Sequence, residues 1–201
     1  MKKLGLVCLT LIATSIFAEP KVLALAGSTR EDSYNKKLIR EAAAIAQEMG
    51  AAVTLVDLKD FPMPFYDGDL EAREGMPENA KKLRDLMMES DSVIIASPEY
   101  NASIPAVLKN AIDWMSRGER GGGSHDAYKG KKFALISASP GRGGGARSLV
   151  HLRAVIEEVE GTVLEKQVSI PKAHTAFNGK GALESDAVRN ELREEIQQLI
   201  D

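Results

Sequence analysis

The sequence predicts a three-layer α/β domain built around a five-stranded parallel sheet. Short apolar runs alternate with helical patterns along the chain, which is typical of repeated strand–helix units. Several of these runs are almost continuously apolar, as expected for strands that are buried on both faces of a parallel sheet. The length of 201 residues and the hydrophobic fraction of 44% suit one domain with a sizeable core.

The expected elements are justified by their patterns in chain order. Strands are expected over residues 22–26, 52–56, 92–96, 133–137 and 162–170. Helices are expected over residues 33–49, 78–90, 106–116, 146–160 and 184–200. In the first helix, Leu38, Ala42 and Ile45 fall on one face. Gly50 and Gly161 follow helices at the position where a left-handed residue ends a helix.

The first 18 residues are predicted to be a secretory signal peptide that precedes the domain at 19–201. Lys2 and Lys3 come before an uncharged, mostly apolar run, 4–18, that is too short for a comfortable membrane span. The first expected strand is complete without this run, although a buried N-terminal strand or helix is an alternative. A used signal predicts a periplasmic or secreted protein, and otherwise a cytoplasmic one.

Composition excludes several classes of function. Cys8 is the only cysteine, so a mature chain that starts at Glu19 would have no disulfide, catalytic thiol or Cys-ligated metal. The net charge of −3 argues against a nucleic acid or an anionic membrane as partner. The three histidines, at 125, 151 and 174, lack metal-ligand spacing, and no metal site is expected.

A polar loop follows the first expected strand and leads into the first helix. Gly27 permits a tight turn, and hydroxyl, amide and guanidinium groups that suit a phosphate follow it: Ser28, Arg30, Ser33 and Asn35. The helix start adds unpaired N–H groups at the same place. An ordinary helix capped by Ser33 is the alternative, but it does not explain the clustering of the other groups.

Two further loops follow the third and fourth expected strands. The first, 97–105, is stiffened by Pro98 and Pro105 and carries Tyr100, which can lie against a flat ring. The second is glycine-rich, and Gly141 and Gly143 formally match a dinucleotide-binding pattern, but that pattern belongs after a first strand. Because ligands of open α/β sheets bind at the carboxyl ends of strands, the loops together predict a site for a phosphorylated ligand.

These motifs resemble those of the NADPH-dependent FMN reductases, a flavodoxin-like group that includes bacterial quinone, chromate and azo-dye reductases. The matching stretches are 26–30, Ser33, Asn35, 98–101, 103–105 and 108–114, and the resemblance covers roughly residues 21–170. It implies a flavodoxin-like fold, bound FMN, NAD(P)H as electron donor and a small-molecule acceptor such as a quinone. It also implies a homodimer or homotetramer with interfaces beside the flavin.

The resemblance assigns residues to the three parts of FMN. The phosphate and ribityl chain would be bound by Ser28, Arg30, Ser33 and Asn35. The isoalloxazine ring would be held by Pro98, Glu99, Tyr100 and Asn101, with Ser139, Gly141 and Gly143 on its other side. The flavin carries the redox chemistry, so no catalytic side chain is predicted.

Three interpretations of function remain open from sequence alone. The leading one is an NAD(P)H-dependent FMN oxidoreductase. The others are a flavodoxin-like electron carrier that does not turn over NAD(P)H, and a flavin-free binding protein outside the cytoplasm. The apolar loop at 61–66 is expected to pack at a dimer interface near the flavin, because exposed apolar segments usually mark interaction sites.

Overall fold

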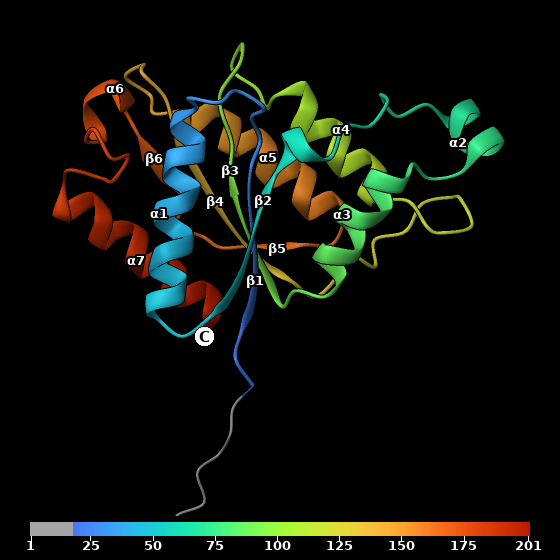
Figure 1. Cartoon of the computed structure of the whole chain (residues 1–201), viewed down its shortest axis with the longest axis horizontal. Coiled ribbons are helices and arrows are strands. Elements are labelled where there is room, and N and C mark those ends of the chain that lie inside the picture. The colour runs from blue at the N-terminus through green and yellow to red at the C-terminus, as the bar shows by residue number, and fades with distance from the viewer. Residues whose placement is uncertain (1–17) are drawn as a thin grey trace, which may run out of the picture.

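A parallel sheet of six strands forms the centre of the computed structural model, which describes residues 18–201 (Figure 1). The strands are β1 (Lys21–Ala26), β2 (Ala52–Asp57), β3 (Ser92–Ala96), β4 (Lys132–Ala138), β5 (Thr162–Val163) and β6 (Val168–Ile170). Their order is β2-β1-β3-β4-β5, and β6 also pairs with β4. The chain therefore has the flavodoxin-like architecture that the sequence predicts.

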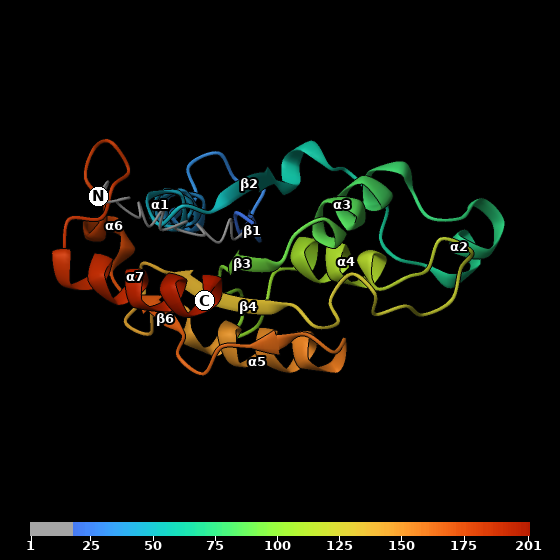
Figure 2. The same cartoon turned by 90° about the horizontal axis from the view of Figure 1, so that it is seen from below.

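Helices cover both faces of the sheet (Figure 2). They are α1 (Tyr34–Glu48), α2 (Gly68–Glu74), α3 (Glu78–Met88), α4 (Ala106–Met115), α5 (Ala146–Glu158), α6 (Ala173–Ala176) and α7 (Asp186–Ile200). Helices α1 and α7 pack on one face, and α3, α4 and α5 on the other. Helix α2 projects from the body at one end of the long axis (Figure 1).

Burial on both faces explains why the central strands are apolar at every position. Val22 and Ala24 of β1 belong to the cluster beneath α1 and α7, whereas Leu23 and Leu25 belong to the cluster beneath α3, α4 and α5. All five residues of β3 are buried as well. The prediction of a parallel sheet covered on both sides is confirmed.

The expected fifth strand, 162–170, is not continuous. Strand β5 pairs with the start of β4 and β6 with its end, and residues 164–167 leave the sheet between them. Arg153 of α5 explains the break, because its guanidinium donates to the carbonyl oxygens of Val163, Leu164 and Glu165. These carbonyls are thereby satisfied by a side chain in place of a neighbouring strand.

The two glycines expected to end helices act differently. Gly50 has a φ of +89°, as predicted, but the left-handed residue after α5 is Glu160, with a φ of +66°. A Cβ atom at Gly161 would lie 2.6 Å from Cγ2 of Ile156 and 2.7 Å from Cε2 of Phe133. Close packing of α5 on β4 therefore requires glycine at 161.

The long loop after β2 is tied to α4. Nδ2 of Asn110 and Nε1 of Trp114 both donate to the carbonyl oxygen of Pro64, at 2.9 and 2.8 Å. Oδ1 of Asn110 accepts from the N–H of Tyr66 at 2.8 Å. Helix α2, which the sequence did not predict, follows and is held by the ion pair between Arg117 and Glu71.

The predicted signal peptide lies outside the described residues except for Ala18. Ala18 and Glu19 are exposed, and β1 begins at Lys21. None of the helices between residues 18 and 201 is long and apolar enough to cross a membrane.

Candidate functional site

The loops after β1, β3 and β4 meet around one cavity at the carboxyl ends of the strands. Its lining residues come from all three loops: Arg30, Ser33, Tyr34, Asn35, Pro98, Glu99, Tyr100, Ala138, Ser139 and Pro140. Strand order reverses between β1 and β3, which is where open α/β sheets bind ligands. Seven of the residues predicted from sequence therefore lie together.

The start of α1 forms one end of the cavity. Ser33 occupies the N-cap position and is nearly buried, but its side chain makes no capping hydrogen bond. Ser28 is buried and does not line the cavity, and its Oγ accepts from the N–H of Arg30 at 3.3 Å, which leaves its hydroxyl proton free to be donated. Arg30 is exposed and has no ion-pair partner among residues 18–201. With the unpaired N–H groups of the first helical turn, these side chains suit a phosphate.

Asn35 lines the same cavity and also joins α1 to β4. Its Nδ2 donates to the carbonyl oxygen of Ala138, and its Oδ1 accepts from the N–H of Ala138, both at 2.9 Å. The side chain is buried, and each end of its amide is already bonded. Asn35 thus fixes the distance between two cavity walls, and its direct contact with a ligand stays a prediction.

The loop after β3 presents an aromatic ring at the cavity mouth. Tyr100 and Ser103 exchange two backbone hydrogen bonds of 3.0 Å across a two-residue turn. Asn101 and Ala102 occupy that turn with φ values of +52° and +64°. Tyr100 remains 47% exposed, and Asn101 lies at the turn outside the cavity lining. The turn therefore fixes a ring surface beside the start of α1.

Glu99 connects this loop to the start of α5. Its carboxylate accepts from Nε of Arg147 at 2.9 Å and from the N–H of Arg147 at 3.2 Å. The side-chain hydrogen bond from Arg147 is the main reason that the pKa of Glu99 lies below its usual range. The sequence interpretation placed Glu99 at the site but missed Arg147, which carries no local motif.

The glycine-rich loop after β4 needs glycine at positions other than those singled out from sequence. Cβ atoms at Gly145 and Gly144 would lie 1.8 Å from Ser137 Oγ and 2.9 Å from the backbone of Ile170, and both residues have positive φ. Gly141 and Gly143 are exposed and face no such contact. Neither glycine lines the cavity, whereas Ser139 of the same loop does. Contact between these glycines and a ring therefore stays a prediction.

Tyr34 is a cavity residue that the sequence interpretation missed. Its ring stacks on Phe177 with centroids 6.3 Å apart, and Nζ of Lys37 lies 5.4 Å from its centroid. The available signal was an aromatic residue between Ser33 and Asn35, at the first position of the helix. In the described part of the chain, no group of three or more His, Cys, Asp or Glu side chains could hold a metal ion.

Comparisons with known proteins match this site and fold. The family model described as NADPH-dependent FMN reductase matches residues 20–175. An NAD(P)H-dependent FMN reductase of Pseudomonas aeruginosa is 36% identical over 180 residues, 89% of this chain and 92% of that protein. A quinone reductase of Escherichia coli K12 is 35% identical over 146 residues, 73% of this chain and 74% of the relative.

A solved structure supports the same relationship. FerB, a flavoenzyme NAD(P)H:(acceptor) oxidoreductase from Paracoccus denitrificans, superimposes with a TM-score of 0.76 at 29% identity. The match covers 90% of this chain and 96% of FerB. The three-loop cavity lies within the region that these comparisons cover.

Proposed function

The chain belongs to the NADPH-dependent FMN reductase family, and we propose that the cavity at the strand ends is where it holds FMN. The protein is an FMN-containing oxidoreductase that passes electrons from NAD(P)H to quinone-type acceptors. The observation that carries the assignment is the convergence of Arg30, Ser33, Tyr100 and Ser139 on one cavity at the start of α1. The geometry fits a molecule with an anionic end and a flat ring.

The phosphate of FMN would be bound at the start of α1. Ser28 and Ser33 have hydroxyl groups available there, and Arg30 brings a charged donor without a competing carboxylate among the described residues. The N–H groups of the first helical turn point the same way, and the positive end of the helix dipole favours an anion. The chain thereby binds the phosphate without requiring a metal.

The ring would be held between the loops after β3 and β4. Pro98 and Tyr100 form one wall and Ser139 and Pro140 the other. FMN, when bound, would supply the redox chemistry between the nicotinamide donor and the acceptor. The chain's part is to orient the ring, and Tyr100 at the cavity mouth is half-exposed. No side chain is assigned as an acid or base.

The direct test is a visible spectrum of the purified, FMN-loaded protein before and after NADPH is added without oxygen. The proposal expects flavin absorbance that is lost on addition of NADPH, followed by its return with a quinone. Bound FMN that NAD(P)H does not reduce would indicate an electron carrier. A protein that takes up no FMN would contradict the assignment of the cavity.

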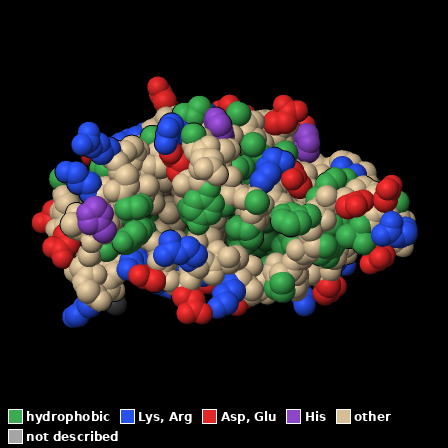
Figure 3. All heavy atoms as spheres, turned by 90° about the horizontal axis from the view of Figure 1, so that it is seen from above, with side chains coloured by type: hydrophobic (Ala, Val, Ile, Leu, Met, Phe, Trp, Pro, Cys, Tyr) green, Lys and Arg blue, Asp and Glu red, His purple; other side chains and the backbone are tan. Residues whose placement is uncertain are grey.

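A homodimer formed through the segment 61–66 is the second part of the proposal. Phe65 is 75% exposed, and the neighbouring Pro62 and Pro64 are exposed as well. Seen from the cavity side, hydrophobic side chains form a band from the middle of the molecule towards α2 (Figure 3). Apolar surface of this kind is typical of an interface.

Export is the third part. The Lys2-Lys3 start and the uncharged run at 4–18 support a signal peptide. The exposure of Ala18 and Glu19, ahead of β1 at Lys21, would leave the folded domain intact after cleavage. The exported protein would then be periplasmic or secreted.

A further inference from the structure

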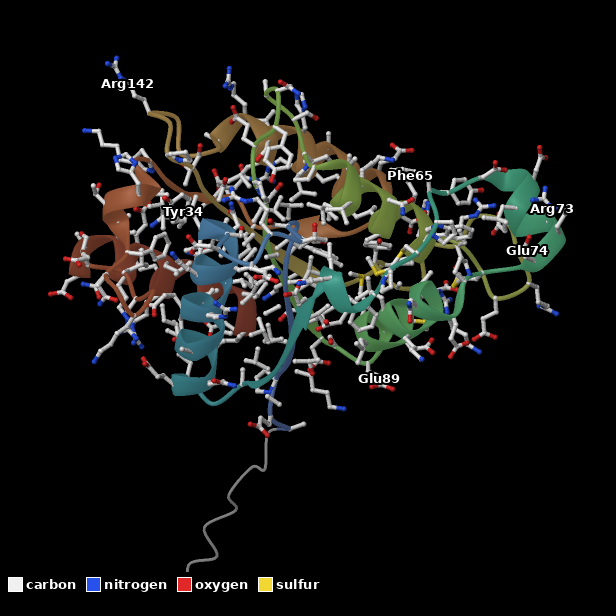
Figure 4. All side chains as sticks on the ribbon, turned by 45° about the horizontal axis from the view of Figure 1, so that its top comes forward. Tyr34, Phe65, Arg73, Glu74, Glu89 and Arg142 are labelled. Carbon is white, nitrogen blue, oxygen red and sulfur yellow. The ribbon has the colours of Figure 1, made fainter. Side chains whose placement is uncertain are left out.

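Two cationic residues without an assigned anion lie on backbone segments that adjoin the cavity wall at Ser139 and Pro140. Arg142 is in the loop after β4, and Lys172 precedes α6. Both are exposed, and neither has an ion-pair partner in the part of the chain that the structure describes. Figure 4 shows Arg142 projecting into solvent from the rim of the strand ends.

The backbones that carry these cations are joined into one rigid rim. The N–H of Lys172 donates to the carbonyl oxygen of Gly141 at 3.2 Å, and the N–H of Ala173 to that of Ser139 at 3.0 Å. Lys172 has a φ of +50°, an unfavourable conformation for a residue other than glycine. The surrounding hydrogen bonds hold it there, so the position of the Lys172 backbone relative to Arg142 is fixed by the fold.

Other basic groups near the cavity already have partners or a proposed ligand. Arg147 is paired with Glu99, and Nζ of Lys37 lies 2.6 Å from Oδ1 of Asp32. Arg30 is assigned to the FMN phosphate at the opposite wall. Arg142 and Lys172, unpaired among the described residues, are therefore available to an anionic group of a substrate.

We propose that Arg142 and Lys172 bind the 2′-phosphate of NADPH and make the enzyme prefer NADPH over NADH. This inference rests on the proposed function, because the nicotinamide must reach a ring bound beside Ser139. The remainder of the dinucleotide then has to extend along the rim. The 2′-phosphate is the only chemical difference between the two donors, and a nearby arginine is the usual way to accommodate it. Arginine binds phosphate with paired, charge-assisted hydrogen bonds.

The test uses the FMN-loaded enzyme with Arg142→Ala, Lys172→Ala and both changes together. KM and kcat are measured for NADPH and for NADH with the same quinone. Binding of adenosine 2′,5′-bisphosphate and of 5′-AMP is measured by calorimetry. The double variant is expected to raise KM for NADPH roughly tenfold and to weaken binding of the bisphosphate by the same factor. The effect is no larger because solvent and salt screen exposed charges. KM for NADH, AMP binding and kcat should change less than twofold.

Arg73→Ala is the matched control. Arg73 is an exposed arginine without an ion pair in the described chain, and it lies on α2 at the far end of the molecule (Figure 4). It should leave both donors unaffected. Equal losses for NADPH and NADH would assign the cations to the shared diphosphate and overturn the inference, as would no change in either. If the wild-type enzyme oxidised neither donor, the proposed function would fail, and the bisphosphate titration would still decide the role of Arg142 and Lys172.

Discussion

At the scale of single residues, Arg30 carries the positive charge at the end of the cavity where we propose that the phosphate binds. Arg30→Ala is expected to weaken FMN binding roughly tenfold to hundredfold, because it removes a charge-assisted hydrogen bond to the phosphate. Fluorescence titration of flavin-free protein with FMN measures the effect. Arg30→Lys keeps the charge and should lose less. An unchanged dissociation constant for Arg30→Ala would remove Arg30 from the phosphate site.

Glu195 is a residue whose surroundings could not be expected from sequence. It lies on α7 with its side chain fully buried, and neither carboxyl oxygen has a hydrogen-bond partner among the described atoms. Burial raises the pKa of Glu195 from 4.5 to about 8, and the negative charge of Glu191 adds to this rise. The positive charge of Lys166 and the backbone groups of Val168 and Leu135 lower the pKa and offset part of the rise. The carboxyl therefore sits beside the break in the sheet as a neutral acid.

The raised pKa of Glu195 predicts that stability falls as pH rises. Between about pH 4.5 and pH 8 the unfolded chain releases this proton while the folded chain retains it, so the folded state binds more protons. The free energy of unfolding should decrease by roughly 1 kcal/mol per pH unit across that window. Glu195→Gln keeps the shape without the titration, and should flatten this part of the pH dependence.

Urea unfolding at pH 5, 6, 7 and 8 measures this dependence. Glu158→Gln is the control, because Glu158 is exposed at the end of α5 and is not among the groups that shift the pKa of Glu195. It should keep the wild-type slope. Parallel slopes for wild type and Glu195→Gln would show that Glu195 does not titrate in this range.

At the scale of elements, the turn between β4 and α5 is fixed by close contacts among small residues. Ser137 Oγ donates to the carbonyl oxygen of Ser97 at 2.7 Å, which binds the end of β4 to the end of β3. Gly145 passes directly over Ser137 with a φ of +92°. The two loops that would flank the FMN ring are thereby held at a set separation.

This contact predicts unequal effects for two glycines in the same turn. Gly145→Ala should lower the free energy of unfolding by more than about 2 kcal/mol, because its Cβ would overlap Ser137 Oγ and its φ disfavours a side chain. Gly143→Ala should be nearly neutral, since no atom lies within 4 Å of its Cβ. Denaturant unfolding of both variants provides the comparison. Similar losses for the two would contradict the packing argument.

At the scale of the whole molecule, Phe65 is the exposed aromatic residue of the proposed dimer interface. Phe65→Ser should weaken dimerisation by tenfold or more, because buried aromatic side chains carry much of the binding energy of interfaces. Analytical ultracentrifugation at micromolar concentration measures the equilibrium. Leu55→Ser is the control, since Leu55 is 48% exposed on the edge strand β2. A wild-type protein that sediments as a stable monomer would contradict the interface.

Export also concerns the whole molecule. The mature chain is expected to begin near Glu19, because the run at 4–18 has the length and charge pattern of a signal peptide. Mass spectrometry of protein from fractionated native cells identifies its first residue and compartment. Replacing Lys2 and Lys3 with Glu should reduce export. A chain that begins at Met1 and is recovered only from the cytosol would refute export.

The sequence by itself determined the layered α/β architecture, the order of the main elements and the loops that form the cavity. These features follow from local chemistry. Continuous apolar runs require burial on both faces, and Pro98 and Pro105 restrict their own backbones. The family followed as well, because its motifs lie in short contiguous stretches such as 108–114.

Only the tertiary structure decided features that depend on residues distant in the chain. Arg153 interrupts the fifth strand and Arg147 fixes Glu99. The side-chain amide of Asn35 forms hydrogen bonds with the backbone of Ala138, 103 positions away. Likewise, Gly145 is required by Ser137, whereas Gly143 has space around it. Such contacts arise when the sheet brings strand ends together, and no local pattern records which side chain will meet which backbone group.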